Sequence, residues 1–220
     1  MENDKSQRGI FLKSEGNRYY KRNAHAEHVA LGYATIAKFV CAGDVVLEIG
    51  CSSGVNLSWL RKNFGCKAFG VDPSIEAIRA GRCRDRSLRL RVGTAEKLPY
   101  PSESCDVVVF GFCLYLVDRQ FLSRVVAEAD RVLRSGGYLA ITDFEPNVPT
   151  LRAYKHRKGI FSYKCNYPAI FAAFPHFVIV DKMHYSHDGS SFVKEPGDRV
   201  ATTVLFKDTV NAYLPLHKDA

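Results

Sequence analysis

The stretch "VLEIGCSSGVNLSWL" (Val46–Leu60) decides the fold class of this chain. An apolar run reaches an acid, Glu48, then a turn containing Gly50 and Gly54, and an amphipathic segment begins directly after the turn. A buried strand that passes through a glycine turn into a helix is typical of the first unit of doubly wound α/β proteins. An acid at the tip of such a strand is costly to bury unless a polar partner meets it. The sequence therefore predicts a ligand-binding turn with a carboxylate beside it.

Strand-like and helix-like segments alternate along most of the remaining chain. Strands separated by helices predict βαβ units and a parallel sheet with helices on both faces. Two further strand patterns near the C-terminus have no clear helix between them, and they predict an antiparallel hairpin at the edge of the sheet. We therefore expect an α/β protein with a Rossmann-like, doubly wound and mostly parallel sheet. The expected strands are 45–49, 67–71, 88–92, 106–112, 137–144, 176–185 and 199–207, and the expected helices are 24–39, 55–63, a helix beginning at Pro73, and 120–133.

Length and composition indicate one soluble domain. The chain has 220 residues, 46% of them hydrophobic and 25% charged, which suits a single domain with a substantial core. No apolar run approaches the ~20 residues of a membrane span, and the polar N-terminus lacks the apolar centre of a signal peptide. The seven cysteines have no C-x-x-C spacing, which predicts reduced thiols, without disulfides or a metal site. We therefore expect a cytoplasmic protein.

The net charge of +8 is concentrated in two stretches. One stretch, residues 79–91, contains six arginines and one acid, and the other, residues 152–164, contains five cations without an acid. Such clusters suit an anionic partner, either a phosphorylated small molecule or nucleic acid. A solvated surface with a basic bias explains them equally well, so the sequence leaves both interpretations open.

The turn after the first strand excludes two common nucleotide-binding motifs. A dinucleotide fold requires G-x-G-x-x-G, but Ser52 stands where the second glycine would be. A P-loop requires G-K-[ST], which does not follow here. The carboxylate of Glu48 would also repel a pyrophosphate, whereas it would attract a ligand that carries an ammonium and a sulfonium.

Several segments together resemble one enzyme family. The turn from Glu48 to Gly54 is followed by Asp72, which closes the second strand. "GTAEKLPYPSESCDVVVFGFCLYLVD" (93–118) and "ADRVLRSGGYLAITDF" (129–144) follow in order. In residue type, order and spacing, these segments resemble the class I S-adenosylmethionine-dependent methyltransferases, and in particular the small bacterial, methyltransferase-11-like members. The resemblance covers about residues 45–144 and implies S-adenosyl-L-methionine as the cofactor.

The resemblance also implies cofactor contacts at individual positions. The glycines of the turn would let the backbone pass close under the methionine part, and Glu48 would face its amino end. Asp72 would accept both ribose hydroxyls, because two carboxylate oxygens suit a vicinal diol. Thr94 stands where the family often has aspartate, which puts the usual adenine contact in question. The implied cofactor-binding residues are Glu48, Gly50, Cys51, Ser52, Gly54, Asp72, Pro73, Ser74, Thr94, Ala95, Glu96, Phe110 and Gly111.

Catalytic and substrate roles are less tightly specified. Methyl transfer depends mainly on aligning the acceptor with the sulfonium, and Tyr115 stands where many relatives carry histidine. Tyr115 is the catalytic candidate, although an unperturbed phenol with a pKa near 10 is a weak base; forming a wall of the pocket is the alternative. The substrate-contact candidates are Tyr19, Tyr20 and Arg22 in a lid, and Tyr154, His156 and Arg157 after the fifth strand.

The sequence thus predicts a single methyltransferase domain over residues 1–220. Its expected parts are a lid and helix (1–40), a cofactor-binding core (45–144), a substrate-side insertion (145–175) and C-terminal strands (176–220). The expected activity is methyl transfer to a small, anionic acceptor such as a sugar, a nucleotide-sugar or another metabolite. RNA methylation is the first alternative, and a non-catalytic nucleotide-binding or partner protein on the same fold is the second. The oligomeric state is left open.

Overall fold

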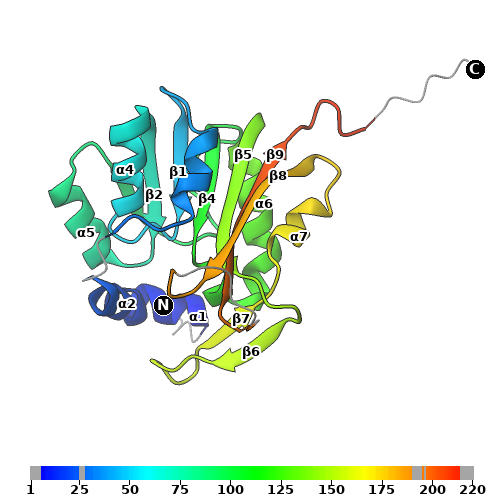
Figure 1. The fold of residues 1–220 in the computed structure, drawn as a ribbon. Coiled ribbons are helices and arrows are strands. Elements are labelled where there is room, and N and C mark those ends of the chain that lie inside the picture. Colours follow the sequence, from blue (N-terminus) through cyan, green and yellow to red (C-terminus); the bar gives the residue numbers. More distant parts are fainter. Residues whose placement is uncertain (1–5, 25–27, 190–194, 196, 214–220) are drawn as a thin grey trace, which may run out of the picture.

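A computed structural model describes residues 6–24, 28–189, 195 and 197–213 of the chain. Its centre is a seven-stranded sheet with the strand order β3-β2-β1-β4-β5-β9-β8 (Figure 1). The five neighbouring strands from β3 to β5 in this order pair in parallel, and β9 pairs antiparallel with both β5 and β8. This sheet confirms the predicted Rossmann-like fold with an antiparallel hairpin at its edge. The strands are β1 (Val45–Ile49), β2 (Lys67–Asp72), β3 (Arg89–Val92), β4 (Cys105–Gly111), β5 (Leu133–Phe144), β8 (Phe177–Ser186) and β9 (Arg199–Lys207).

Helices cover both faces of the sheet, and each face has its own hydrophobic core. Alternate residues of a strand point to opposite faces, so Val46 packs into one core and Leu47 into the other. The first core receives residues from α3 (Tyr33–Ile36), α4 (Val55–Phe64) and α5 (Ile75–Arg84). The second receives residues from α6 (Leu122–Val132) and α7 (Pro168–Ala172). Burial on both faces explains why β4 is a continuous apolar run.

The structure corrects two predicted helix boundaries. The helix expected over residues 24–39 is wrong in extent, because residues 28–30 are not helical and α3 continues only through the 3₁₀ turn Ala37–Phe39. The helix expected to begin at Pro73 begins at Ile75. Ser74 has an extended backbone, and its hydroxyl oxygen accepts a hydrogen bond from the backbone N–H of Ala77 at 3.1 Å. Ser74 is therefore the N-cap that the sequence pattern did not identify.

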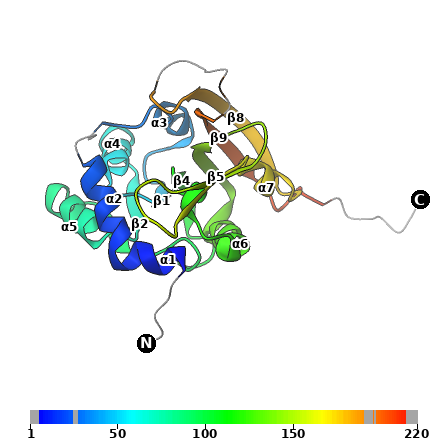
Figure 2. The same ribbon diagram turned by 90° about the horizontal axis from the view of Figure 1, so that it is seen from below.

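Two chain segments that are distant in sequence meet at the carboxyl ends of the parallel strands. The N-terminal one consists of α1 (Gln7–Ile10), a π-helical turn (Phe11–Glu15) and α2 (Gly16–Asn23). The other is a separate two-stranded hairpin of β6 (Thr150–Ala153) and β7 (Phe161–Lys164). Figures 1 and 2 show both at the same end of the sheet. We call residues 6–24 and 150–164 the cover.

Two hydrogen-bond contacts join the halves of the cover. The guanidinium of Arg22 donates to the hydroxyl of Tyr154 at 3.0 Å and also to the carboxylate of Glu15 at 2.6 Å. The side-chain amide of Gln7 pairs with the backbone of Phe161, accepting from its N–H at 2.8 Å and donating to its carbonyl at 3.0 Å. The same amide donates to the carbonyl of Leu116 at 2.9 Å. The N-terminal helices are thereby attached to both the hairpin and the loop after β4.

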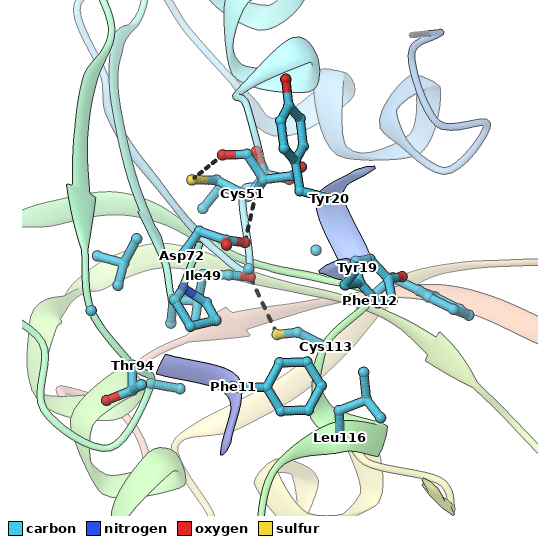
Figure 3. A pocket seen from close by; sticks show the side chains of 18 of the residues that line it. Phe11, Tyr19, Tyr20, Ile49, Cys51, Asp72, Thr94, Phe112, Cys113 and Leu116 are labelled. Carbon is cyan, nitrogen blue, oxygen red and sulfur yellow. Dashed lines mark hydrogen bonds between the residues drawn. The ribbon is translucent and has the colours of Figure 1, made fainter. Parts of the chain in front are cut away.

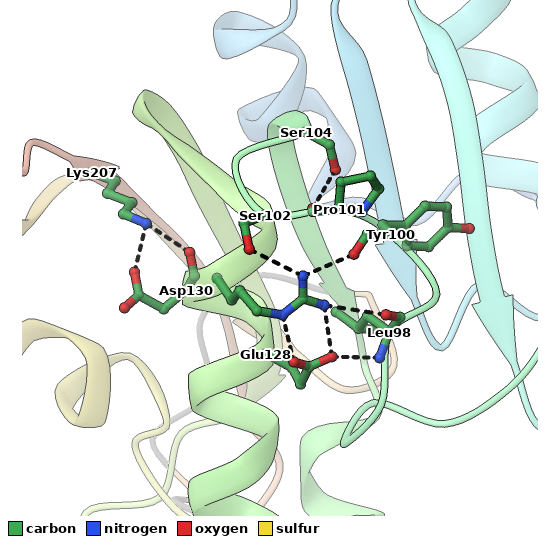
Figure 4. Close-up of polar contacts among 9 residues, drawn as sticks. Leu98, Tyr100, Pro101, Ser102, Ser104, Glu128, Asp130 and Lys207 are labelled. Atoms are coloured by element: carbon green, nitrogen blue, oxygen red, sulfur yellow. Dashed lines mark hydrogen bonds and ion pairs between the residues drawn. The ribbon is translucent and has the colours of Figure 1, made fainter.

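The loop between β3 and β4 is anchored to α6 (Figure 4). Arg131 donates to the carbonyls of Tyr100 at 2.9 Å and Leu98 at 3.2 Å, and it pairs with Glu128 at 2.6 Å. Glu128 in turn accepts from the backbone N–H of Leu98 at 2.7 Å. These charge-assisted contacts hold the loop in one conformation, and the loop begins with the predicted segment Thr94–Glu96.

Candidate functional site

A cavity of about 310 Å³ lies between the N-terminal half of the cover and the ends of β1, β2 and β4 (Figure 3). Its volume is at the lower end of the range for small-molecule sites, ~300–1,000 Å³. This is also the point where the strand order reverses, between β1 and β4, and doubly wound sheets bind ligands at such points. The fold therefore places a ligand-sized cavity where the sequence predicted one.

The turn after β1 forms the floor of the cavity with its backbone. Gly50 has a φ of +77°, and a Cβ added there would lie 2.7 Å from the Cβ of Cys113. Only glycine therefore fits at this position, for both conformational and steric reasons. Asp72 holds the turn in place, because its two carboxylate oxygens accept from the backbone N–H groups of Ser52 and Ser74, each at 2.8 Å.

Asp72 and Glu48 are two acids facing one cavity. Burial raises the pKa of Asp72 to about 6, although hydrogen bonds from Ser74 and Ser52 lower it. Burial likewise raises the pKa of Glu48 to about 7, against the lowering effect of hydrogen bonds from Tyr33 and Asn56. Both acids are thus close to titrating near neutral pH, which marks them as candidates for a functional site.

The carboxylate of Glu48 is only half satisfied. Its residue is 1% exposed, and its Oε1 accepts from the Tyr33 hydroxyl at 2.5 Å and from the Asn56 amide at 3.3 Å. Its Oε2 is buried and has no hydrogen-bond partner among the residues that the structure describes. A buried, unpaired carboxylate oxygen is costly, and Glu48 is among the residues that line the cavity.

A third buried acid, Asp143, lies at the end of β5 and does not line the cavity. It is 3% exposed and accepts from the backbone N–H groups of Phe144 at 2.8 Å and Tyr115 at 3.2 Å. Burial raises its pKa to about 7. Asp143 therefore fixes the loop after β4, which includes the 3₁₀ turn Leu114–Leu116.

The loop after β3 closes one side of the cavity. The hydroxyl of Thr94 donates to Glu96 at 2.7 Å, and Arg8 from the N-terminal segment reaches the same carboxylate at 3.5 Å. The guanidinium of Arg8 also lies 4.5 Å from the ring centroid of Phe121. Thr94 thus uses its hydroxyl within the loop, while Ala95 is also part of the lining.

The structure brings most of the predicted cofactor residues together, but not all predicted site residues. Two lid candidates, Tyr19 and Tyr20, also line the cavity. Eight candidates do not: Gly54, Ser74, Phe110, Tyr115, Arg22, Tyr154, His156 and Arg157. The predicted cofactor residues that line it are Glu48, Gly50, Cys51, Ser52, Asp72, Pro73, Thr94, Ala95, Glu96 and Gly111.

The outlying cofactor candidates have structural positions. Phe110 is 0% exposed and packs against Phe171 in the core, with ring centroids 6.1 Å apart. Gly54 takes a left-handed conformation at the N-cap of α4, and Ser74 is the N-cap of α5. Sequence reasoning placed these residues at the ligand because their neighbours are there, and strand alternation or helix capping turns them away.

The substrate candidates of the insertion lie outside the cavity. Tyr154 is half-buried within the cover, where it accepts from Arg22. His156 is exposed and Arg157 is only partly buried. These three residues and Arg22 are therefore parts of the cover rather than of the cavity wall.

Tyr115 is buried behind the cavity, with 7% of its surface exposed. Burial raises its pKa well above the usual value, and the neighbouring Tyr19 and Asp143 raise it further. A phenol in this environment keeps its proton at neutral pH, so in this conformation Tyr115 is suited to packing or hydrogen-bond donation rather than to accepting a proton.

Sequence reasoning missed an apolar wall. Phe11, Phe112, Cys113, Leu116 and Val117 all line the cavity (Figure 3). Phe112 has a φ of +57°, an uncommon conformation for a residue other than glycine. The available signals were the apolar triplet "IFL" (10–12) in a polar leader and the apolar segment that continues past the end of β4.

The described residues include neither a membrane-spanning helix nor a cluster of metal-binding side chains. None of their helices is long and apolar enough to cross a membrane. They also contain no group of three or more histidine, cysteine or acidic side chains that could hold a metal ion.

Comparisons with known proteins agree with this geometry. Residues 47–141 match the family model described as "Methyltransferase domain". The phthiotriol/phenolphthiotriol dimycocerosates methyltransferase of Mycobacterium tuberculosis is 35% identical over 125 residues, covering 54% of this chain and 45% of that protein. The fatty-acid O-methyltransferase of Mycolicibacterium smegmatis is 32% identical over 121 residues, covering 54% of this chain and 43% of that protein. The chain thus spans less than half the length of these curated relatives.

A solved structure extends the comparison to the whole fold. It is the Burkholderia thailandensis 1,6-didemethyltoxoflavin-N1-methyltransferase with bound 1,6-didemethyltoxoflavin and S-adenosylhomocysteine. The TM-score is 0.68 at 16% identity, and the match covers 90% of this chain and 87% of that one. Residues 47–141 are therefore similar to a methyltransferase domain, and the chain has the fold of the class I S-adenosylmethionine-dependent methyltransferases, as the sequence resemblance predicted.

Proposed function

We propose that this protein is an S-adenosylmethionine-dependent methyltransferase that acts on a small molecule. The observation that carries the proposal is the pair of acids at one cavity. Glu48 presents a buried oxygen without a described partner, and Asp72 closes the strand beside the same turn. The methyltransferase domain over residues 47–141 supports the same conclusion.

The residues present fit this cofactor. Glu48 would bind the ammonium of its methionine part, and Asp72 would accept from the ribose hydroxyls. Phe11 and Leu116 line the cavity on the apolar side and would pack against the adenine. When bound, S-adenosylmethionine supplies a methyl group activated on a sulfonium. This ligand carries no phosphate, so a carboxylate beside the turn does not repel it as it would a dinucleotide's pyrophosphate.

The chain's own contribution to catalysis would be alignment and exclusion of water. Positioning a nucleophile in line with the methyl group removes much of the entropic barrier. The N-terminal half of the cover lines the cavity, and the loop after β4 is fixed by Asp143 and by Gln7. Tyr115 would support this loop from behind, and we assign no general base.

The acceptor's reacting part is proposed to be apolar. Beyond the residues assigned to the adenine, the apolar wall near the loop after β4 consists of Phe112, Cys113 and Val117. Among the lysines and arginines that the structure describes, Arg8 alone lines the cavity, and it contacts Glu96. The curated relatives named above act on dimycocerosate lipids and on fatty acids. We therefore place lipid-like or aromatic acceptors ahead of the anionic sugars that the sequence suggested.

RNA methylation is the alternative that the two basic stretches suggested. Contacts within the protein that the first stretch (residues 79–91) makes weaken this interpretation. Arg82 donates to the carbonyl of Leu90 at 3.0 Å, and Arg84 donates to the carbonyl of Ser53 at 2.7 Å. Arg89 lies 5.7 Å from the ring centroid of Phe69. These arginines hold α5 and β3 in place, which gives them a structural reason to be there.

The experiment is a methyl-transfer assay with labelled S-adenosylmethionine and three acceptor panels. The panels contain fatty acids and hydroxylated lipids, nucleotide sugars, and tRNA with rRNA. We expect label in the first panel. Label in RNA alone, with binding that weakens steeply with salt, would refute the small-molecule proposal. Cofactor binding without transfer to any panel would favour the non-catalytic alternative.

A further inference from the structure

A buried hydrogen-bond chain surrounds the unpaired acid. The hydroxyl of Tyr33, on α3, donates to Glu48 Oε1 at 2.5 Å, and Tyr33 is itself 1% exposed. The side-chain amide of Asn56, at the start of α4, donates to the same oxygen at 3.3 Å. The other end of that amide accepts from the backbone N–H of Ala30 at 3.0 Å. Both contacts to Glu48 therefore converge on one of its two oxygens.

We propose that Tyr33 and Asn56 are positioning residues that hold Oε1 of Glu48 and leave its Oε2 for the ligand's ammonium group. The inference rests on the proposed function, since it takes the ligand to carry an amino-acid part. Neither residue was identified from the sequence. The two residues act through Glu48.

Gly111 leaves room for the carboxylate in this position. A Cβ added at Gly111 would lie 2.6 Å from Glu48 Oε1 and 3.1 Å from the carbonyl oxygen of Gly50. The two hydrogen bonds from Tyr33 and Asn56 then fix Oε1 in that space. The carboxylate can rotate only by giving up its two hydrogen bonds. The free oxygen is thus preorganised, which reduces the entropic cost of binding a cation.

The hydrogen-bond chain around Glu48 also links the ligand to residues before α3. His28 and Ala30 both line the cavity, and Asn56 ties the backbone of Ala30 to Glu48. A cation bound at Oε2 strengthens the charged form of Glu48 and therefore both hydrogen bonds to Oε1. Binding at the amino-acid end should consequently order the wall formed by residues 28–30.

Protonation of Glu48 competes with the cation. The pKa of Glu48 is raised to about 7, chiefly by burial and also by the charge of Asp72 on β2, against the lowering effect of the hydrogen bonds from Tyr33 and Asn56. The thiols of Cys51 and Cys113 also face this group, but burial raises their pKa values well above the usual value, so they remain neutral. Binding of an ammonium below about pH 7 should therefore release a proton from Glu48.

Two ligands separate this inference from the proposed function. S-adenosylhomocysteine has the ammonium, whereas 5′-methylthioadenosine has the same adenosine and thioether but no amino-acid part. Calorimetry with both ligands on Tyr33→Phe is the test, with Asn56→Ala as the second variant. Tyr167→Phe is the matched control, because Tyr167 is also fully buried, and its hydroxyl donates to the carbonyl of Tyr163 and accepts from Arg119 without contacting Glu48.

We expect Tyr33→Phe to weaken S-adenosylhomocysteine binding by about threefold to tenfold, less than the full effect of a lost hydrogen bond to a charged group, because Tyr33 acts on the ligand only through Glu48. The affinity for 5′-methylthioadenosine should stay within twofold, and Tyr167→Phe should change neither. As pH falls from 8 to 6, S-adenosylhomocysteine should lose more affinity than 5′-methylthioadenosine. Tyr33→Phe should move the midpoint of that additional loss to higher pH, because it removes a contact that lowers the pKa of Glu48.

Each outcome has one meaning. Equal losses for both ligands would show that Tyr33 supports the fold only, and unchanged binding of S-adenosylhomocysteine to both variants would refute the positioning role. If the unsubstituted protein bound neither ligand, the proposed function itself would fail.

Discussion

Replacing Gln7 by alanine should open the cover without unfolding the sheet. The side chain is 6% exposed and makes three hydrogen bonds, to the carbonyl of Leu116 and to the N–H and carbonyl of Phe161. At a net ~0.5–1.5 kcal/mol each, these contacts contribute about 1.5–4.5 kcal/mol to the closed form. Because Phe161 is 40% exposed, its released backbone groups can bind water, so we expect a value near the lower end. Opening should therefore become about 10- to 50-fold more frequent.

Hydrogen exchange measures this opening directly. The amide of Phe161 donates to Gln7, so its exchange should accelerate by the same factor in Gln7→Ala, while amides of β4 and β5 should not change. If the ligand leaves through the opened cover, the dissociation rate of S-adenosylhomocysteine should rise in parallel. The matched control is Asn63→Ala, which removes an exposed side-chain amide that donates to the carbonyl of Trp59 within α4, away from the cover. Unchanged exchange at Phe161 with an unchanged dissociation rate would refute the account of the cover.

Three further predictions concern Asp72, the space that Gly111 leaves for Glu48, and the titration of Glu48 and Asp143. Asp72→Asn should weaken S-adenosylhomocysteine binding at least tenfold, the effect of ~1.5–3 kcal/mol, and Asp72→Ala should also lower the melting temperature, because the N–H of Ser52 loses its acceptor. Gly111→Ala should abolish binding measured by calorimetry, since its Cβ would lie 2.6 Å from Glu48 Oε1; retained affinity would contradict the geometry. Burial raises the pKa values of Glu48 and Asp143 to about 7, so the folded state binds protons more tightly and the stability of the ligand-free protein should fall as pH rises from 5.5 to 8. Glu48→Gln should flatten that profile, and an unchanged profile would exclude Glu48 as a contributor.

The sheet and the turn could be predicted from the sequence because each signal is local. Apolar runs identify strands such as β4, and the spacing of Gly50 and Gly54 identifies the turn that opens α4. Asp72 could be identified because its position at the end of β2 is a matter of order along the chain. Local patterns do not reveal capping as readily, so the start of α5 was placed two residues early, at Pro73 instead of Ile75.

The cavity wall could not be predicted because it depends on tertiary contacts. Phe11 and Gln7 approach the loop after β4 only when the N-terminal helices fold across the sheet, and their sequence separation from that loop exceeds 100 residues. Tyr33 also gives no local signal, since an apolar helix face explains it fully. The basic and aromatic residues of the insertion are predicted at the substrate from their side chains and their place after the fifth strand, but Tyr154, His156 and Arg157 do not line the cavity.

The most direct test of the central claim is calorimetric titration of the purified protein with S-adenosylhomocysteine and, separately, with NAD. The account predicts one S-adenosylhomocysteine per chain and a melting temperature that rises with ligand concentration, by the equivalent of about 2.7 kcal/mol at 100 times Kd. NAD should neither bind nor stabilise, because Glu48 would face its pyrophosphate. Binding of NAD without binding of S-adenosylhomocysteine would contradict the account and favour a dinucleotide enzyme.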